Sequence, residues 1–214
     1  MKFLPVLFCL LCLPALAAPV VVYDQSAYLS PPPGTPAYGL DSGFSLASSF
    51  TTGGSTMTLS NILTGIVYAN SGGSSGPGLS LGLFSDGGGV PGTQVASLTL
   101  QDPVTFTLDT IAPLVSWAPD AVTVLSANTT YWVVASSSVL NGYSWRMSNV
   151  MGSYRFNGGG TGGPWTSSTF YLPTMQVLAD AGEAPELDGS SALLPAFLAV
   201  GLLLGGRRKR AAQG

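Results

Sequence analysis

The chain has 214 residues, a length typical of one domain with short extensions, and a formal net charge of −3. Charged residues make up 8% of it, whereas apolar residues reach 46% and aromatic residues 10%, which suffices for a packed core and argues against disorder. Basic residues concentrate at the two ends, and the sequence between them holds only Arg146 and Arg155. Because nucleic-acid binding needs a basic surface that neutralises phosphates, this distribution excludes a nucleic-acid partner.

Residues 1–18 have the pattern of a secretory signal peptide. Lys2 supplies a positive charge, an apolar run follows over 3–16, and the small residues Ala17 and Ala18 provide a cleavage site. The apolar run is shorter than the roughly 20 residues that a membrane-spanning helix needs, which disfavours an N-terminal anchor. Both cysteines lie in this segment, so the exported chain is expected to contain no thiol and no disulfide.

Residues 19–180 are expected to form one extracellular all-β domain, a β-sandwich or jelly roll. No segment shows a sustained helical period, and β-branched and aromatic residues alternate with Ser, Thr and Gly between turn-forming dipeptides. The alternative, disorder from the high glycine and serine content, does not account for this alternation. The proline-rich segment 24–41 is expected to be a long surface loop, because proline cannot donate to a strand ladder. The expected strands are 20–23, 44–52, 57–68, 79–85, 95–100, 104–109, 122–125, 130–136, 143–147, 152–156 and 174–178.

The strand expected at 130–136 is apolar on both sides, since Tyr131 and Val133 alternate with Trp132 and Val134. This pattern favours a central strand covered on both faces. The alternative is that Trp132 lies on a binding face.

Residues 143–156 are expected to form a hairpin with Asn149 and Val150 as its turn. In this register Arg146 and Arg155 share one face as diagonal neighbours, about 7–8 Å apart, while the aromatic residues of both strands face the core. Two guanidinium groups at that spacing would bind a carboxylate or sulfate. The alternative is that each arginine pairs with a surface aspartate.

Two further weak candidates lie in glycine-rich stretches. Trp165 and Tyr171 would stack on sugar rings if exposed, although core positions are the alternative. Asp86 precedes three glycines and is a candidate ligand of a structural calcium ion, although a hairpin turn with a solvated carboxylate explains the same pattern. No other cofactor is expected.

Catalytic groups are scarce in residues 19–180. The absence of histidine, and of cysteine after the signal peptide, excludes His-dependent triads, thiol catalysis and most zinc sites. This segment also lacks glutamate, and its aspartates occur in no glycosidase-like motif. We therefore expect a non-enzymatic domain; a hydrolase with two aspartates brought together by folding is a third interpretation.

Three segments together resemble the choice-of-anchor R domain of bacterial surface proteins. They are VYD at 22–24, LSLGLFSD at 79–86 with PGT at 91–93, and LSANTTYWVV at 125–134. The similarity runs from about residue 20 to residue 177. It implies an extracellular β-rich domain joined to interchangeable sorting tails, and it implies no particular activity.

The C-terminal segment is expected to be a membrane-sorting tail. An acidic linker at 181–191 leads into an apolar helix at 192–206, and the segment 207–214 is a basic cytoplasmic tail. The apolar helix would span roughly 22 Å, and snorkelling arginines and local thinning would make up the difference from a ~30 Å hydrocarbon core. The basic cluster consists of Arg207, Arg208, Lys209 and Arg210.

The order of short motif, apolar helix and basic cluster resembles a PEP-CTERM tail, which an exosortase recognises and cleaves in bacteria that make exopolysaccharide. The family motif is Pro-Glu-Pro, and here Pro185 and Glu186 are followed by Leu187 instead of a second proline. The resemblance implies the membrane and an exosortase-type protease as partners. A permanent membrane anchor is the alternative to a processed tail.

These features predict an exported bacterial protein that is anchored at the cell surface or released to the extracellular matrix after tail processing. We expect a structural or adhesive role in the cell envelope or exopolysaccharide, because a weakly charged domain rich in Ser, Thr and Gly suits a hydrated matrix. A carbohydrate-binding module with a defined glycan site is the alternative.

Overall fold

The computed structural model describes residues 18–27, 37–68, 78–101, 114–139, 142–159 and 163–181, all of which lie in one compact unit. Within these ranges the protein is all-β, as predicted, and contains no helix. The strands are β1 (Val20–Asp24), β2 (Ala37–Leu40), β3 (Phe44–Thr51), β4 (Met57–Thr64), β5 (Ile66–Tyr68), β6 (Leu79–Asp86), β7 (Pro91–Leu100), β8 (Val115–Pro119), β9 (Val124–Leu125), β10 (Thr130–Ser137), β11 (Tyr143–Asn157), β12 (Thr166–Pro173) and β13 (Met175–Ala181).

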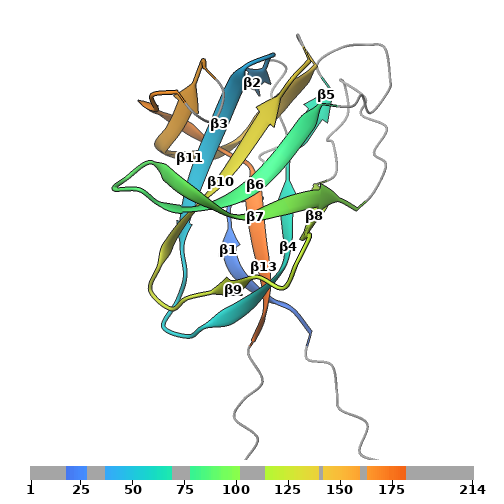
Figure 1. The fold of residues 1–214 in the computed structure, drawn as a ribbon, viewed down its shortest axis with the longest axis vertical. Coiled ribbons are helices and arrows are strands. Elements are labelled where there is room, and N and C mark those ends of the chain that lie inside the picture. The colour runs from blue at the N-terminus through green and yellow to red at the C-terminus, as the bar shows by residue number, and fades with distance from the viewer. Residues whose placement is uncertain are drawn as a thin grey trace, which may run out of the picture. The chain divides into compact units, whose positions relative to one another are not determined.

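The strands form one curled antiparallel sheet (Figure 1). Its main path runs β1-β13-β4-β8-β7-β6-β10-β3-β11-β12, while β2 and β5 pair with β11 and β9 pairs with β4. The curl brings the inner faces of distant strands together around a common core. In this core, Ile62 of β4 and Val177 of β13 belong to the same cluster as Leu83 of β6 and Val133 of β10. Because side chains alternate along each strand, the residues between these core positions face outward.

The core contains two tryptophans whose indole N–H groups are satisfied inside the protein. Trp145 is fully buried and donates to the carbonyl of Thr174 at 2.9 Å, and Trp117 donates to Thr64 Oγ1 at 2.9 Å. Buried N–H groups left without an acceptor would cost stability, so these bonds allow the large rings to occupy the interior. Tyr143 and Tyr154 are buried as well, which confirms the predicted inward face of the aromatic residues.

The predicted hairpin at Asn149 and Val150 is wrong, because β11 runs without reversal from Tyr143 to Asn157. Its first part pairs with β2 and β5, its last part pairs with β3 and β12, and the register against β12 shifts between Met147 and Met151. A bulge therefore replaces the turn. Val150 explains why a bulge forms here instead of a turn. A two-residue hairpin turn favours glycine or asparagine at its left-handed positions and disfavours a β-branched residue such as valine.

Other differences from the predicted strands are local. Part of the expected loop forms β2, which pairs with β11, and the single strand expected over 57–68 is divided at Gly65 into β4 and β5. Strands β8 and β12 were not predicted, since proline flanks the first and glycines precede the second. The expected strand at 104–109 lies outside the described residues.

Strand β10 is central, as its two apolar faces predicted. It lies between β6 and β3, and its register with β6 extends from Tyr131 opposite Ser85 to Ser137 opposite Leu79. Both rows of its side chains are covered, and Trp132 is only 4% exposed.

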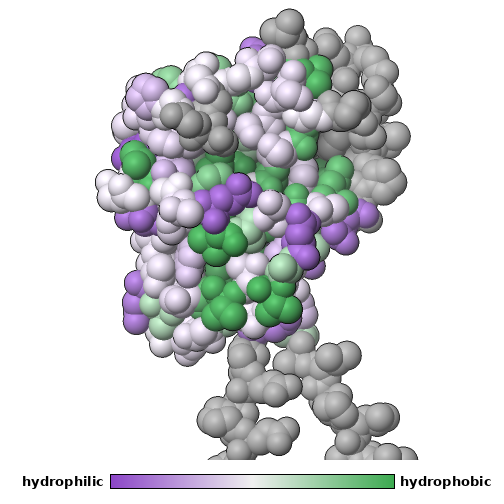
Figure 2. Space-filling view, in the orientation of Figure 1, coloured by the Kyte–Doolittle hydropathy of each residue, from purple (hydrophilic) through white to green (hydrophobic). Residues whose placement is uncertain are grey.

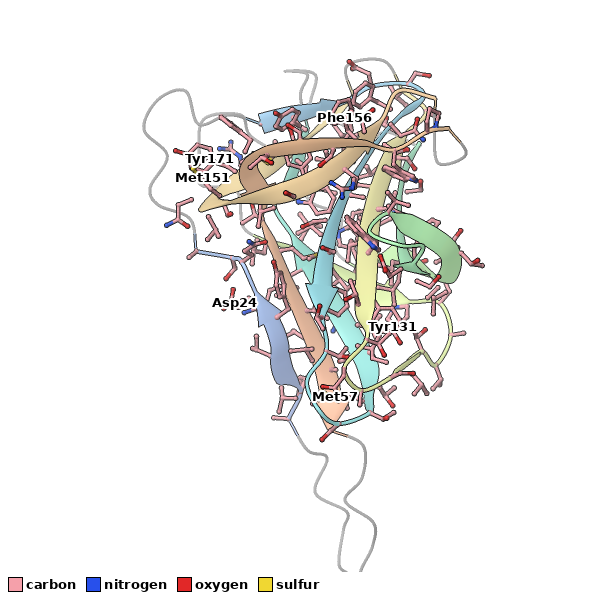
Figure 3. The ribbon with its side chains drawn as sticks, turned by 90° about the vertical axis from the view of Figure 1, so that its left-hand side faces the viewer. Asp24, Met57, Tyr131, Met151, Phe156 and Tyr171 are labelled. Atoms are coloured by element: carbon pink, nitrogen blue, oxygen red, sulfur yellow. The ribbon has the colours of Figure 1, made fainter. Side chains whose placement is uncertain are left out.

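Strands β1 and β13 are neighbours that bring both ends of the domain to the same place. Val20 pairs with Ala179, and the chain enters β1 and leaves β13 at one end of the sheet (Figure 1). Met57 pairs with Ala181 at this end, and Asp24 marks the other end of β1 (Figure 3). We call the end with Val20 and Ala181 the terminal end of the domain.

The expected signal peptide before Ala18 and the sorting tail lie outside the described residues. This applies to the cleavage residue Ala17, to Pro185 and Glu186, and to the basic cluster. In the described ranges, none of the secondary structure is a helix with the length and apolarity needed to cross a bilayer.

Candidate functional site

Three of the predicted site residues meet on the outward face of β6, β10 and β11. Asp86, Arg155 and Trp165 surround Trp132, which packs with Ala47, Val134, Phe84 and Trp165 in a small cluster separate from the main core. We call Phe84, Asp86, Trp132, Arg155 and Trp165 the Trp132 cluster. The alternation along β6 and β10 places Phe84 and Trp132 directly opposite each other.

The Asp86 carboxylate accepts hydrogen bonds from Trp132 and from the turn between β6 and β7. Its Oδ1 accepts hydrogen bonds from Trp132 Nε1 at 2.8 Å and from Gly89 N at 2.9 Å, and Oδ2 accepts a weaker one from Gly88 N at 3.3 Å. These donors lower the pKa of Asp86, with the indole bond contributing most. Gly88 and Gly89 both have positive φ, so the glycine turn that was the alternative to a calcium site is present.

The part of the chain that the structure describes contains no group of three or more His, Cys, Asp or Glu side chains placed to hold a metal ion. Asp24, another carboxylate at a strand end, accepts hydrogen bonds from the backbone and hydroxyl of Ser26 and from Gln176. The pKa of Asp24 is lowered, chiefly by the Ser26 hydroxyl. Both carboxylates thus stabilise local backbone structure.

Arg155 ties the β6–β7 turn to β11 and β12. Its Nε donates to the Gly89 carbonyl at 2.9 Å, its Nη1 donates to Ser167 Oγ, and its guanidinium carbon lies 5.7 Å from the centre of the Trp132 ring. A cation over an indole face is attractive by about 0.5–1 kcal/mol at partly exposed sites. The arrangement therefore uses Arg155 for packing and hydrogen bonding within the domain.

Arg146 does not share a patch with Arg155, so the predicted arginine pair is wrong. The two residues are nine positions apart on one strand, roughly 30 Å of extended chain, and they pair with different neighbours. Arg146 lies opposite Ala37 of β2, whereas Arg155 lies opposite Ala47 of β3 and Ser167 of β12. Because β11 continues without a turn, Arg146 and Arg155 lie far apart, whereas a hairpin would have made them neighbours.

Trp165 and Tyr171 are also separate. Trp165 packs in the Trp132 cluster, while Tyr171 pairs with Met151 and packs edge-on against Phe170 at 4.9 Å. Tyr171 and Met151 lie together at one edge of the molecule, away from Phe156 (Figure 3). Both aromatic residues are half-buried, in agreement with the alternative that they contribute mainly to packing.

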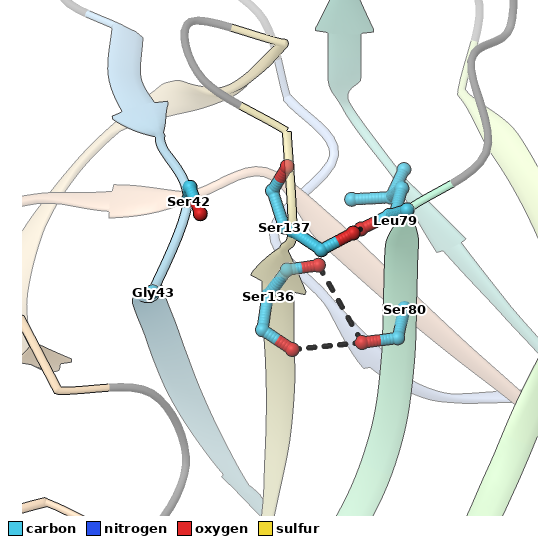
Figure 4. Close-up of a pocket in the computed structure, with 8 residues that line it drawn as sticks. Ser42, Gly43, Leu79, Ser80, Ser136 and Ser137 are labelled. Carbon is cyan, nitrogen blue, oxygen red and sulfur yellow. Dashed lines mark hydrogen bonds between the residues drawn. The ribbon is translucent and has the colours of Figure 1, made fainter.

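A pocket of about 500 Å³, which the sequence did not suggest, lies where β3 begins, β6 begins and β10 ends (Figure 4). We call it the serine pocket. Five serines, two glycines and Leu79 line it, its accessible surface is about equally polar and apolar, and none of these described residues is charged. The lining residues are Ser42, Gly43, Gly78, Leu79, Ser80, Ser136, Ser137 and Ser138.

The serines of the pocket form hydrogen bonds with one another and with the adjoining backbone. Ser80 Oγ lies 2.7 Å from Ser136 Oγ, and Ser137 Oγ donates to the carbonyl of Val139, just outside the lining, at 3.1 Å. The backbone of Ser138 donates to the Gly78 carbonyl at 2.8 Å, while its hydroxyl makes only a long contact of 3.4 Å to the same oxygen. The structure thus presents several hydroxyls that can both donate and accept.

Glycine shapes the pocket at two positions. Gly43 and Gly78 have φ values of 77° and 120°, which other residues rarely adopt. At Gly78 a Cβ atom would also lie 2.4 Å from Ser138 Oγ. Side chains are therefore excluded at this point.

The serine pocket lies at the opposite end of β10 from the terminal end of the domain. Thr130, at the start of β10, pairs with Thr51, and the turn that follows β3 leads to Met57 beside Ala181. Ser137 and Leu79 pair at the far end of the same ladder. We call this the distal end.

Apolar side chains also gather on the surface over β7 and β9 (Figure 2). The exposed valines of these segments are Val95, Val122 and Val124. Scattered exposed valines are common on soluble domains, so this surface is a weaker candidate than the serine pocket.

No family model and no curated protein matches this sequence.

Proposed function

We propose that the protein is an exported, non-enzymatic β-sandwich or jelly-roll domain that is attached to a membrane through its C-terminal segment and acts in the cell envelope or exopolysaccharide. The tail serves as an exosortase-type sorting signal, and processing releases or transfers the domain. Its role is structural or adhesive. The choice-of-anchor and PEP-CTERM resemblances support this proposal from the sequence.

The observation that carries the proposal is the pairing of β1 with β13. Val20 lies opposite Ala179, so the segment that follows the proposed signal peptide and the segment that precedes the proposed linker meet at the terminal end. A domain tethered there leaves its distal end free to face the surroundings. This arrangement suits a protein that must present one surface away from a membrane.

The chemistry of the described residues suits adhesion better than catalysis. Asp24 and Asp86 are occupied by hydrogen bonds within the domain, and Arg155 is bound to Gly89 and Ser167. The outward faces of β11 and β12 carry uncharged Ser and Thr side chains, such as Ser153 and Thr169. Neutral hydroxyl surfaces form many weak, exchangeable hydrogen bonds with hydrated polymers.

Protease accessibility in intact cells tests the orientation. The proposal predicts that external protease removes the domain from washed cells while a cytoplasmic marker protein stays intact. A matched variant with Arg207, Arg208, Lys209 and Arg210 all changed to Gln is expected to lose its fixed orientation, because the positive cluster retains the tail in the cytoplasm. Protection of the unmodified domain until the cells are lysed would contradict the proposal.

A further inference from the structure

We propose that the serine pocket binds a neutral saccharide unit and that the distal end is therefore the adhesive surface of the domain. This inference rests on the proposed extracellular role and deepens it, since it names the ligand class and the site. It adds a binding site that differs from the predicted candidates Arg146, Arg155, Trp165 and Tyr171.

The size of the pocket fits a small ligand. About 500 Å³ lies within the 300–1,000 Å³ range of small-molecule sites, and the lining comes from the ends of β6 and β10 and from the residues that adjoin β3, β6 and β10. Gly43 and Gly78 place no side chain in the pocket, while the Gly43 N–H donates to the Ser137 carbonyl and the Gly78 carbonyl accepts from the Ser138 N–H, which leaves the serine hydroxyls as the groups that would bind a ligand.

The chemistry of the lining selects for a polyhydroxylated ligand. Ser42, Ser80, Ser136 and Ser138 supply hydroxyl groups, each of which donates one hydrogen bond and accepts others. Sugar hydroxyls have the same dual character, so either partner can reorient to satisfy the other. Leu79 is the one large apolar side chain among the described lining residues, and the accessible lining is about equally polar and apolar, which suits a sugar ring that presents both C–H and O–H groups.

Charge argues for a neutral sugar over an anionic one. None of the described lining residues is charged, and Arg155 is committed to the β6–β7 turn. A uronic acid or sulfated sugar would lose hydration of its charge without gaining a cationic partner. The pocket is therefore expected to discriminate against charged sugars.

The experiment uses the full protein purified from its native membrane or medium, in a detergent without a sugar headgroup. The probes are the methyl glycosides of glucose, galactose, mannose and N-acetylglucosamine, with glucuronic acid as the charged comparison. A ligand that binds only the folded state raises the melting temperature in a concentration-dependent, saturable way. We expect such a rise for at least one neutral glycoside and a smaller one, or none, for glucuronic acid.

Two pairs of variants locate the binding. Ser42 and Ser55 are both exposed, the first at the pocket and the second in the turn between β3 and β4. Ser42→Trp is expected to fill the pocket and weaken binding at least about tenfold, whereas Ser55→Trp leaves it unchanged. Ser80→Ala removes one hydroxyl of the Ser80–Ser136 pair and is expected to weaken binding less, with Ser97→Ala on exposed β7 as its control.

Three results would overturn the inference. These are no saturable effect with any of the neutral glycosides, equal binding in the Ser42→Trp and unmodified proteins, or stronger binding of glucuronic acid. Each leaves the proposed export untouched, since protease accessibility decides that independently. Conversely, sugar binding by a protein that stays inside the cell would support the pocket and contradict the extracellular role.

Discussion

The indole Nε1 of Trp132 lies 2.8 Å from Oδ1 of Asp86 and donates a hydrogen bond to it across 46 positions of sequence. This bond connects the central strand β10 with the glycine turn after β6. Arg155 adds a second connection by donating to the Gly89 carbonyl of the same turn. The turn is therefore fixed from two sides, which explains why a glycine-rich segment adopts one conformation.

The Asp86 bond predicts a pH-dependent contribution to stability. Because hydrogen bonds to the carboxylate lower its pKa in the folded protein, its contribution is present above the unfolded pKa of about 4 and is lost as the pH falls through the folded value. We expect Asp86→Asn to lower the melting temperature at pH 7 and to approach the unmodified protein near pH 2. A melting-temperature difference that stays constant from pH 7 to pH 2 would argue against this role.

The two tryptophans Trp145 and Trp165 are expected to differ sharply in their contribution to stability. Trp145→Phe leaves a cavity in the core and removes the donor to the Thr174 carbonyl, at a cost of about 2–3 kcal/mol. Trp165→Phe acts at a half-buried position and should cost less than about 1 kcal/mol. Urea unfolding of both variants measures the difference, and equal losses would refute the assigned packing.

Glycine substitution distinguishes a bulge from a turn in β11. In a continuous strand, Val150→Gly is expected to reduce stability by roughly 0.5–1 kcal/mol, because glycine loses more conformational freedom on folding. In a hairpin, the resulting Asn-Gly pair would increase stability. Gly88→Ala is the comparison at a true turn, where φ is 87°, and it should cost about 1 kcal/mol. A stabilising Val150→Gly substitution would mean that β11 reverses direction.

Tyr154 is expected to limit stability at alkaline pH. Burial, reinforced by the neighbouring Tyr38 hydroxyl, raises the pKa of Tyr154 to about 12, against about 10 in an unfolded chain. The stabilisation is fully present below pH 10 and is lost as the pH rises from 10 to 12, since only the unfolded chain ionises readily in that window. Tyr154→Phe should flatten this loss in urea unfolding at pH 9, 10 and 11. An unchanged slope would show that other groups determine it.

Alternation in the sequence predicted most of the sheet because it follows directly from side-chain burial. Tyr143, Trp145 and Tyr154 were assigned correctly to the core, and Trp132 to a central strand. The sequence also shows that the buried aromatic residues of β11 stand at odd positions up to Trp145 and at an even position at Tyr154. A turn and a bulge both produce such a change, so local pattern alone did not separate them.

The sites depended on long-range register, which the sequence predicted less well. Asp86, Arg155 and Trp165 were separate candidates, and only the order β6-β10-β3-β11-β12 brings them together around Trp132. The serine pocket is assembled from three segments that each resemble ordinary strand ends. The run of Ser136, Ser137 and Ser138 is the one feature of the sequence that could have indicated it, but serine-rich ends are common in loops and do not single out a pocket.

The most direct test of the whole account is the intact mass, with terminal sequencing, of the protein from its native membrane and from the medium. The proposed export and tail processing predict a species that begins near Pro19 and ends between Ala184 and Ser191. A chain that retains Met1 would contradict export with signal-peptide cleavage. A membrane-bound chain that retains Arg207, Arg208, Lys209 and Arg210 would contradict the processed tail and leave a permanently tethered domain.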